Sequence, residues 1–356
     1  MKTKILIASD EIYPFGWGIG KYAILLQEEL VNQGHQCKLI GTYKHNTSKI
    51  FSYSSELGFQ SKINLMRKFF FTVFYTLKYK PQIILCVHSS NVLIFNYLSI
   101  LRLFNKTKKV IVFHGSDIQK VKQKINLKRL NRNFDKYISI SKYVELKTYE
   151  SLNIKTKTIY NTVERKYYNK SIKRFNKIEQ KYNIIMVGRL DNRKNHALLL
   201  NSIAMLDKDE KMQFDVKLIG NGPHSNSIES IIKKKKLNNF ITILKNINDS
   251  ELEKIYNKSN FLIFPSIEIE GRVEGFGLVV LESILMGVLP ILTPNGGQLE
   301  IVGIDYPLII NNSVELHHIL TNLDNFDFNK IYSNLLKRVK KFHPDLFGHN
   351  YSKFLS

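Results

Sequence analysis

The sequence of 356 residues is poor in cysteine and has no long uncharged apolar run. Its two cysteines, Cys37 and Cys86, each lie inside an apolar segment, so the chain has no cysteine pattern typical of a disulfide framework or a zinc site. A membrane-spanning helix needs about 18 or more consecutive apolar residues, which we do not find. The first residues, MKTKILIASD, lead directly into a strand rather than into a secretion signal. We therefore expect a cytoplasmic protein with buried thiols.

Acidic residues are also scarce, with 30 Asp and Glu against 53 Lys and Arg, for a net charge of +23. Residues 1–165 hold 27 basic and 10 acidic residues (+17), and the remainder hold 26 and 20 (+6). A positive electrostatic field concentrated in the first half of the chain predicts an anionic partner, either nucleic acid or a membrane surface. A general bias toward Lys, Asn and Ile would explain the same composition, and both explanations remain open.

What the chain does contain is an alternation of short apolar runs and helical segments. Its length and its 44% apolar content predict two domains with real cores. In the first half, we expect a helix over about 20–33, ending before Gly34, and strands that are apolar on both faces, as in a parallel sheet covered by helices. These strands begin at Lys4, Cys37, Gln82, Lys109, Lys136 and Lys157.

The alternation starts again after a polar segment over 165–181, which we interpret as a linker. Helices are expected over about 195–206 and 228–236, from Ser250 with Glu253 as a capping box, and after Gly277. Strands are expected to begin at Tyr182, Phe214, Phe240, Phe261 and Leu289. The pattern predicts two α/β domains in tandem, over residues 1–165 and 166–340, followed by a tail over 341–356.

The segment from Ile63 to Lys80, INLMRKFFFTVFYTLKYK, combines aromatic residues with Arg67, Lys68, Lys78 and Lys80. A basic, aromatic helix of this kind can lie in the interface of an anionic inner membrane. The alternative is an ordinary helix that packs its aromatic side chains into the first domain.

The segment EGFGLVVLE has the most specific chemistry in the sequence. Glycines at 275 and 277 allow close backbone approach, and a helix beginning near Gly277 would direct its N–H groups toward an anion such as a diphosphate. Glu274 and Glu282 could accept hydrogen bonds from sugar and ribose hydroxyls. About 80 residues earlier, VGRLDNRKNH places Arg189 after a strand end and Lys194 before a helix, where ligands of open α/β sheets bind. Each charge alone would more often be a solvated surface residue.

Together these segments resemble retaining glycosyltransferases of family 4, the glycosyl transferases group 1. The resemblance rests on GWGIGKY, FHGSD, YNTVE, VGRLDNRKNH, LIGNGP and EGFGLVVLE with the following GVLPILTPNGGQLEIV, in family order over nearly the whole chain. It implies the GT-B fold, in which two Rossmann-like domains face a central cleft. The first domain would bind the acceptor, the second would bind the nucleotide-sugar, and the tail would cross back to the first.

The resemblance also implies roles for individual residues. Arg189 and Lys194 would bind the donor diphosphate, Glu274 the transferred sugar, and Glu282 the ribose. Backbone N–H groups of Gly275, Phe276, Gly277 and Leu278 would lie near the sugar and phosphate, Gly18 and Gly20 would line the cleft, and His114 would lie near the reacting carbon.

The implied reaction is metal-independent transfer of a hexosyl or N-acetylhexosaminyl group with retention, from a UDP-sugar by preference. No cofactor is expected. The acceptor would be a glycan, lipid-linked by hypothesis, in bacterial polysaccharide or lipopolysaccharide assembly. Lys245 and Asn246 stand where many relatives have a glycine near the nucleobase, so the identity of the base stays open. Arg272 is expected to contact the sugar or an acidic neighbour.

Three other hypotheses are weaker. GIGKYA fits a dinucleotide fingerprint, but SDEIYPFGW separates it from its strand and no acidic residue ends the next one. Asp207-Lys208-Asp209 fits a metal-binding Asp-x-Asp, but we expect a loop there. A non-catalytic protein that binds nucleic acid or an anionic surface would fit the charge, including Lys233–Lys236, although no recognition module is present, so nucleic acid is not expected as a partner.

Overall fold

The computed structural model describes residues 2–12, 18–42, 50–53, 62–100, 104, 106–169 and 181–356. These form two compact units, one from Met1–Glu164 with Phe342–Ser356 and the other from Arg165–Lys341. Most of the segment expected as a linker lies outside the described residues, as do Gly16 and Trp17 of the first glycine loop.

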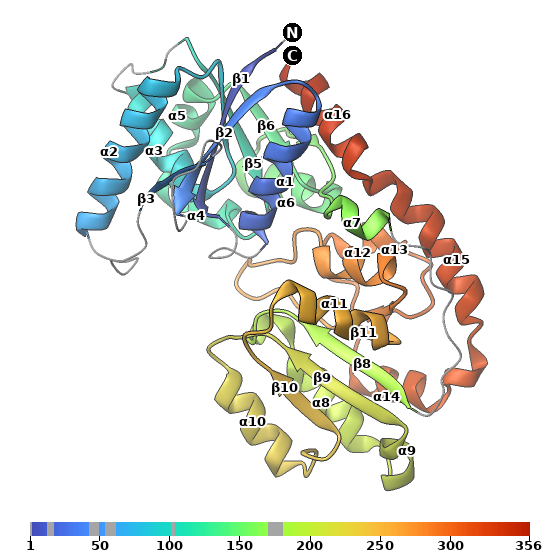
Figure 1. Ribbon diagram of the computed structural model, residues 1–356. Coiled ribbons are helices and arrows are strands. Elements are labelled where there is room, and N and C mark those ends of the chain that lie inside the picture. Colours follow the sequence, from blue (N-terminus) through green and yellow to red (C-terminus); the bar gives the residue numbers. More distant parts are fainter. Residues whose placement is uncertain are drawn as a thin grey trace. The chain divides into compact units, whose positions relative to one another are not determined.

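The described part of the first unit contains a parallel sheet in the order β3-β2-β1-β4-β5-β6-β7 (Figure 1). Burial from both faces explains its apolar runs: Ile5, Leu6 and Ile7 in β1 have no exposed surface. The six expected strands are present, and β3 was not anticipated. The strands are β1 (Lys4–Glu11), β2 (Gln36–Thr42), β3 (Ile50–Tyr53), β4 (Ile83–Cys86), β5 (Lys108–Phe113), β6 (Lys136–Ser139) and β7 (Lys157–Thr158).

The helices of this unit cover both faces of the sheet. One helix leads from β1 to β2, whereas the others connect strands in the opposite direction across the sheet, so right-handed crossovers place the two sets on opposite faces. The first is α1 (Ile19–Asn32); the second set is α2 (Lys62–Tyr79), α3 (Ser89–Ile100), α4 (Ile118–Lys124), α5 (Leu127–Asn133) and α6 (Lys142–Leu152). None of the described helices combines the length and the apolarity needed to cross a membrane.

The last helix of the chain, α16 (Pro344–Leu355), packs against α1 in the first unit (Figure 1). A side chain at Gly348 would meet Cβ of Glu29 at 3.0 Å, so glycine permits the close approach. Oγ of Ser352 lies 2.8 Å from Nε2 of His35, and the buried hydroxyls of Tyr22 and Tyr351 contact each other. These contacts hold the C-terminal segment on the first unit.

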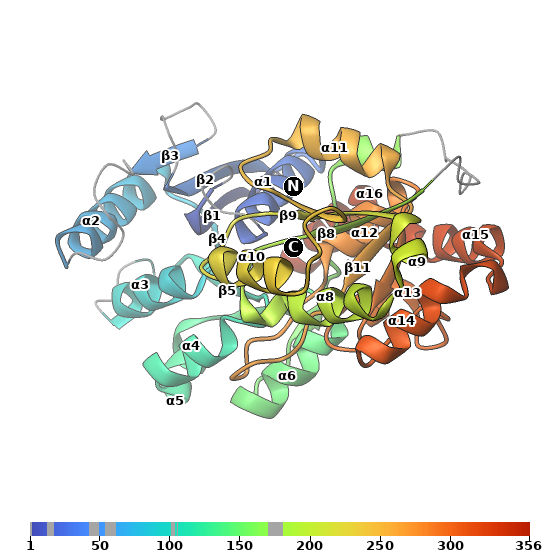
Figure 2. The ribbon, with the colours of Figure 1, turned by 90° about the horizontal axis from the view of Figure 1, so that it is seen from below.

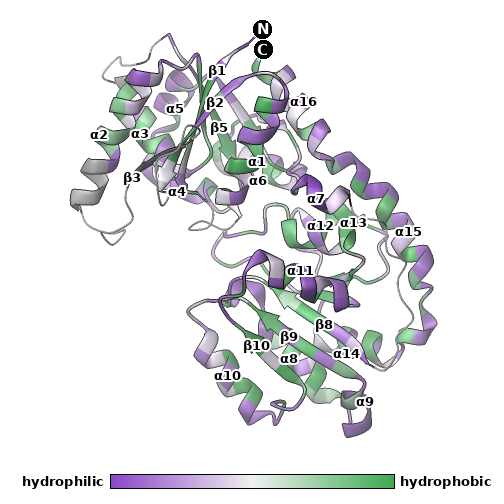
Figure 3. Ribbon diagram, in the orientation of Figure 1, coloured by the Kyte–Doolittle hydropathy of each residue, from purple (hydrophilic) through white to green (hydrophobic). Residues whose placement is uncertain are grey.

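The second unit contains a parallel sheet in the order β10-β9-β8-β11-β12. Apolar residues are frequent in its strands, and hydrophilic residues in several of its helices (Figure 3). Its strands are β8 (Tyr182–Val187), β9 (Phe214–Ile219), β10 (Ile241–Leu244), β11 (Phe261–Phe264) and β12 (Leu289–Leu292). Its helices are α7 (Arg165–Tyr168), α8 (His196–Met205), α9 (Lys208–Met212), α10 (Ser225–Lys234), α11 (Asp249–Lys258), α12 (Leu278–Leu285), α13 (Gln298–Val302), α14 (Ser313–Thr321) and α15 (Phe328–Val339). Short 3-10 turns are η1 (Asn192–Lys194), η2 (Leu323–Asn325) and η3 (Lys340–Phe342).

Two local predictions were wrong. The capping box of α11 is formed by Asn248 and Glu251, two residues before the expected pair, because Asn is as effective as Ser as an N-cap and both registers satisfy the motif. Asp207 does not lie in a loop: it caps α9, with its carboxylate accepting from the backbone N–H of Glu210. That carboxylate is therefore used in helix capping.

Candidate functional site

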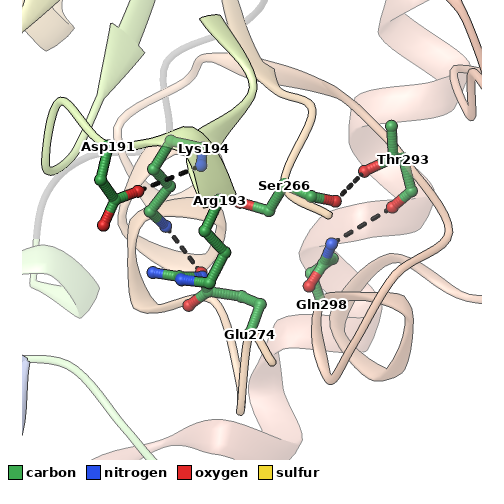
Figure 4. A network of polar contacts seen from close by, with 7 residues as sticks. All are labelled: Asp191, Arg193, Lys194, Ser266, Glu274, Thr293 and Gln298. Atoms are coloured by element: carbon green, nitrogen blue, oxygen red, sulfur yellow. Dashed lines mark hydrogen bonds and ion pairs between the residues drawn. The ribbon is translucent and has the colours of Figure 1, made fainter. Parts of the chain in front are cut away.

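Glu274 lies at the centre of a cationic site in the second unit. It lies on the loop between β11 and α12, whereas Lys194 lies in η1 after β8. Oε2 of Glu274 lies 2.6 Å from Nζ of Lys194 and 2.5 Å from Nη1 of Arg193 (Figure 4). Asp191 caps the η1 turn and accepts from the backbone N–H of Lys194. Residues 80 apart in the sequence thus meet at the carboxyl ends of neighbouring strands, as expected for Lys194 and Glu274.

Charge pairing determines the ionisation of Glu274. Burial by itself would raise the pKa of its carboxyl group, but the charges and hydrogen bonds of Lys194 and Arg193 outweigh burial and lower the pKa to about 2. One carboxylate pairs with two cations, and the Asp191 carboxylate also acts on Lys194, so the charges of these four groups balance. An anionic ligand could replace Glu274 as the partner of these cations.

Arg193 was not singled out from the sequence, because its position next to Lys194 gave no sign of which way its side chain points. Arg189, which was singled out, follows β8 and is exposed. The structure therefore brings Lys194 and Glu274 together, adds Arg193, and leaves Arg189 on the surface at the same strand end.

Glycines allow the backbone around Glu274 to pack closely. Gly277 begins α12 with φ 86, a conformation that favours glycine. The turn containing Gly297 packs against this loop: its N–H donates to the carbonyl of Glu274 at 3.0 Å, and a Cβ on Gly297 would lie 2.2 Å from the carbonyl oxygen of Gly275. Gln298, next in the chain, is fully buried and donates to the carbonyl of Thr293 (Figure 4). The NGGQ turn thus fixes the loop that carries Glu274.

The other residues of the expected donor segment lie just before α12 or within it. Gly275 and Phe276 are buried before the helix, and Leu278 is its first residue. Glu282 lies within the helix and is 8% exposed, and the hydroxyl of buried Tyr256 donates to its Oε2 at 3.5 Å. Tyr256 was not anticipated, because it lies on α11 in a segment that resembles an ordinary amphipathic helix.

The residue that departs from the family pattern takes a conformation suited to glycine. Asn246 has φ 56, in the left-handed region that Asn tolerates better than most residues. Its Oδ1 accepts from Nδ2 of Asn221 in the LIGNGP segment at 2.8 Å, and Lys245 pairs with Glu229. Arg272 has an acidic neighbour, Glu270, at 3.7 Å.

His114, expected in the first unit, directly follows β5. It is 8% exposed, its ring meets that of Tyr22 edge-on at 4.6 Å, and among the described residues its buried Nε2 has no hydrogen-bond partner. Burial, and then the charge of His88, lower its pKa to about 3, so the imidazole is neutral at neutral pH. Gly18 precedes α1 with φ 53, and Gly20 is buried inside that helix.

A polar network near the carboxyl ends of β1 and β4 was not anticipated. Asp10 pairs with Lys68 and with Nδ1 of His88, the latter at 2.9 Å, and Lys68 also donates to Oγ of Ser90 at 2.9 Å. Lys68 is 8% exposed because the Asp10 carboxylate holds it inside the unit, so among the basic residues of the segment from Ile63 to Lys80 it does not face outward. In the described part of the chain, no three side chains of metal-binding type gather into a site.

Comparison with known proteins identifies similar glycosyltransferases. Residues 168–315 match the family of glycosyl transferases group 1. An uncharacterized glycosyltransferase of Methanocaldococcus jannaschii is 32% identical over 199 residues, which cover 54% of this chain and 51% of that protein. An N-acetylgalactosamine-N,N'-diacetylbacillosaminyl-diphospho-undecaprenol 4-alpha-N-acetylgalactosaminyltransferase of Campylobacter jejuni is 29% identical over 178 residues, which cover 48% of this chain and 46% of that protein. The matched regions thus span about half the length of these two relatives.

The fold is also found in solved structures. Anabaena HepE in complex with UDP and glucose superposes with a TM-score of 0.78, at 16% identity, covering 99% of each chain. The expected GT-B architecture of two Rossmann-like units is confirmed.

Proposed function

We propose that the protein is a retaining glycosyltransferase that uses a nucleoside-diphosphate sugar, by preference a UDP-sugar, to extend a bacterial surface glycan. The observation that carries this proposal is the pairing of half-buried Glu274 with buried Lys194 and half-buried Arg193 at the carboxyl ends of β8 and β11. An ordinary structural ion pair would not need two cations on one carboxylate, a helix N-terminus and a buried glutamate nearby in sequence.

In the proposed reaction, the bond between the anomeric carbon and the diphosphate oxygen breaks while the acceptor oxygen bonds to that carbon on the same face. The acceptor's proton passes to the departing diphosphate. Lys194 and Arg189 would stabilise the charge that develops on this diphosphate, and the N-terminus of α12 would add the field of its N–H groups. No step requires a metal ion.

Glu274 and Glu282 would position the donor. On donor binding, the phosphate oxygens would take over part of the contact that Lys194 makes with Glu274, and that carboxylate would accept from hydroxyls of a hexosyl or N-acetylhexosaminyl group. Glu282, held by Tyr256, would accept from the ribose. In the first unit, neutral His114 would lie near the reacting carbon and Gly18 and Gly20 near the donor.

For the acceptor, we propose a glycan carried on a lipid in polysaccharide or lipopolysaccharide assembly. The printed name of the Campylobacter relative describes an acceptor on diphospho-undecaprenol, which supports this class. The protein would then work from the cytoplasm at the inner face of the membrane, with nucleic acid playing no part.

The test is nucleotide release from UDP-, GDP- and ADP-sugars, with and without lipid-linked acceptors and with and without a chelator. Glu282→Ala is expected to abolish release, and Glu150→Ala, which removes an exposed carboxylate in the first unit, to leave it unchanged. If folded protein neither binds nor turns over any donor with acceptor present, the proposal is wrong and a non-catalytic binding protein takes its place.

A further inference from the structure

From Lys68 onward, helix α2 buries a polar row and exposes an apolar row, the reverse of a normal surface helix. Phe70, Phe74 and Leu77 are 63%, 59% and 50% exposed. Their spacing of four and three residues places them on one face of the helix. An aromatic and aliphatic row held in water is unfavourable unless something covers it.

The opposite side of α2 explains this orientation. Thr72 and Thr76 are 1% and 0% exposed, and Oγ1 of Thr76 donates to the carbonyl of Thr72 at 2.6 Å. Lys68, one turn earlier on the same side, reaches Asp10 at the end of β1 and Ser90 at the start of α3. The buried ion pair fixes which side of α2 faces the unit, and the row of apolar residues is therefore held outward.

The neighbouring helices add positive charge without negative charge. Helix α3 packs against both α4 and α5 and lies between them and α2 in the first unit (Figure 2). Residues 118–134 contain no acidic residue. Their basic side chains are all exposed: Lys120, Lys122, Lys124, Lys128, Arg129 and Arg132. Helix α3 itself exposes one large aromatic side chain, Tyr97.

We propose that the row Phe70, Phe74 and Leu77, together with the basic helices α4 and α5, is a docking surface for an anionic phospholipid membrane. The aromatic row would enter the headgroup region, and the lysines and arginines would pair with anionic lipids. A protein partner or second copy would need apolar complementarity, but would not need an acid-free basic flank. The proposal rests on the proposed function only in that a lipid-linked acceptor requires a membrane nearby.

The experiment is co-sedimentation of the full chain with vesicles of phosphatidylcholine, with and without phosphatidylglycerol, at low and high salt. We expect binding to the anionic vesicles at low salt. The double variant Phe70→Ser/Phe74→Ser is expected to lower the partition coefficient by about tenfold or more, from the lost apolar burial. Lys122→Glu/Arg129→Glu is expected to lower it to a similar extent through charge alone.

The matched control is Val31→Ser/Leu346→Ser, which removes two exposed apolar residues from α1 and α16. It should bind like the wild type, and thermal unfolding verifies that each variant is folded. Equal binding of the Phe70/Phe74 variant and the wild type would overturn the proposal. The proposal would also be overturned if the wild type did not bind vesicles but formed a dimer in sedimentation velocity that the Phe70→Ser/Phe74→Ser variant did not form. A second copy would then cover the apolar row.

Donor hydrolysis without acceptor separates this proposal from the proposed function. The Phe70→Ser/Phe74→Ser variant should release nucleotide at the wild-type rate because both residues belong to the first unit's outer helix. Vesicle binding by a protein that neither binds nor turns over any donor with acceptor present would refute the enzyme proposal alone. Nucleotide release without vesicle binding would refute the docking surface alone.

Discussion

Replacing Glu274 by Gln tests whether the cationic site holds a charged carboxylate. The pKa of about 2 lies well below the ordinary value of 4.5. At about 1.4 kcal/mol for each tenfold change in protonation, ionisation of this group stabilises the folded protein by about 3 kcal/mol. We therefore expect Glu274→Gln to lower the free energy of unfolding of the second unit by about 3 kcal/mol at pH 7, because Lys194 and Arg193 lose their counter-charge.

The sign of the pH dependence follows from the same values. The folded-state pKa is lower than the unfolded one, so the stabilisation is fully present above about pH 4.5 and is lost as pH falls toward 2. The difference between wild type and Glu274→Gln should shrink over that window. Urea unfolding followed by circular dichroism at pH 7, 4 and 3 measures it.

The matched control is Glu270→Gln, on the same loop. Glu270 is 82% exposed and faces Arg272 at 3.7 Å, so its removal should change stability by less than about 1 kcal/mol at any pH. If both variants lose the same stability, or if the loss from Glu274→Gln is as large at pH 3 as at pH 7, the proposed electrostatic role of this carboxylate is refuted.

Three further changes probe the same unit. Arg189→Gln should weaken donor binding about tenfold in calorimetry while changing unfolding by less than about 0.5 kcal/mol, since Arg189 is exposed; unchanged binding would remove it from the donor site. Tyr256→Phe should weaken binding of UDP several-fold but not of inorganic pyrophosphate, because the tyrosine holds Glu282, whose proposed partner is the ribose. An equal effect on both ligands would indicate general damage. Gly297→Ala should lower Tm and donor turnover together, because its Cβ would lie 2.2 Å from the carbonyl oxygen of Gly275, and a variant with unchanged Tm would contradict that packing.

The sequence by itself determined the two α/β halves and indicated which residues would form the proposed donor site. Strands buried on both faces must be apolar throughout, so the strands from β1 and β8 onward stood out directly. Glu274 and Lys194 could be assigned to one site in advance because parallel strands end at one edge of a sheet, which brings their following loops together. The short strand β3 was not predicted because its residues have little hydrophobic periodicity. The start of α11 was predicted two residues too late because two registers satisfy the capping-box motif.

Only the tertiary structure decided which way individual side chains point. Arg193 joins Glu274 and Arg189 does not, although both are arginines within five residues, because the η1 turn aims one inward. Likewise, the composition of α2 fitted either a membrane face or a buried helix. The ion pair between Lys68 and Asp10 crosses from one element to another, so no local pattern encodes it, yet it determines that Phe70 and Phe74 face outward.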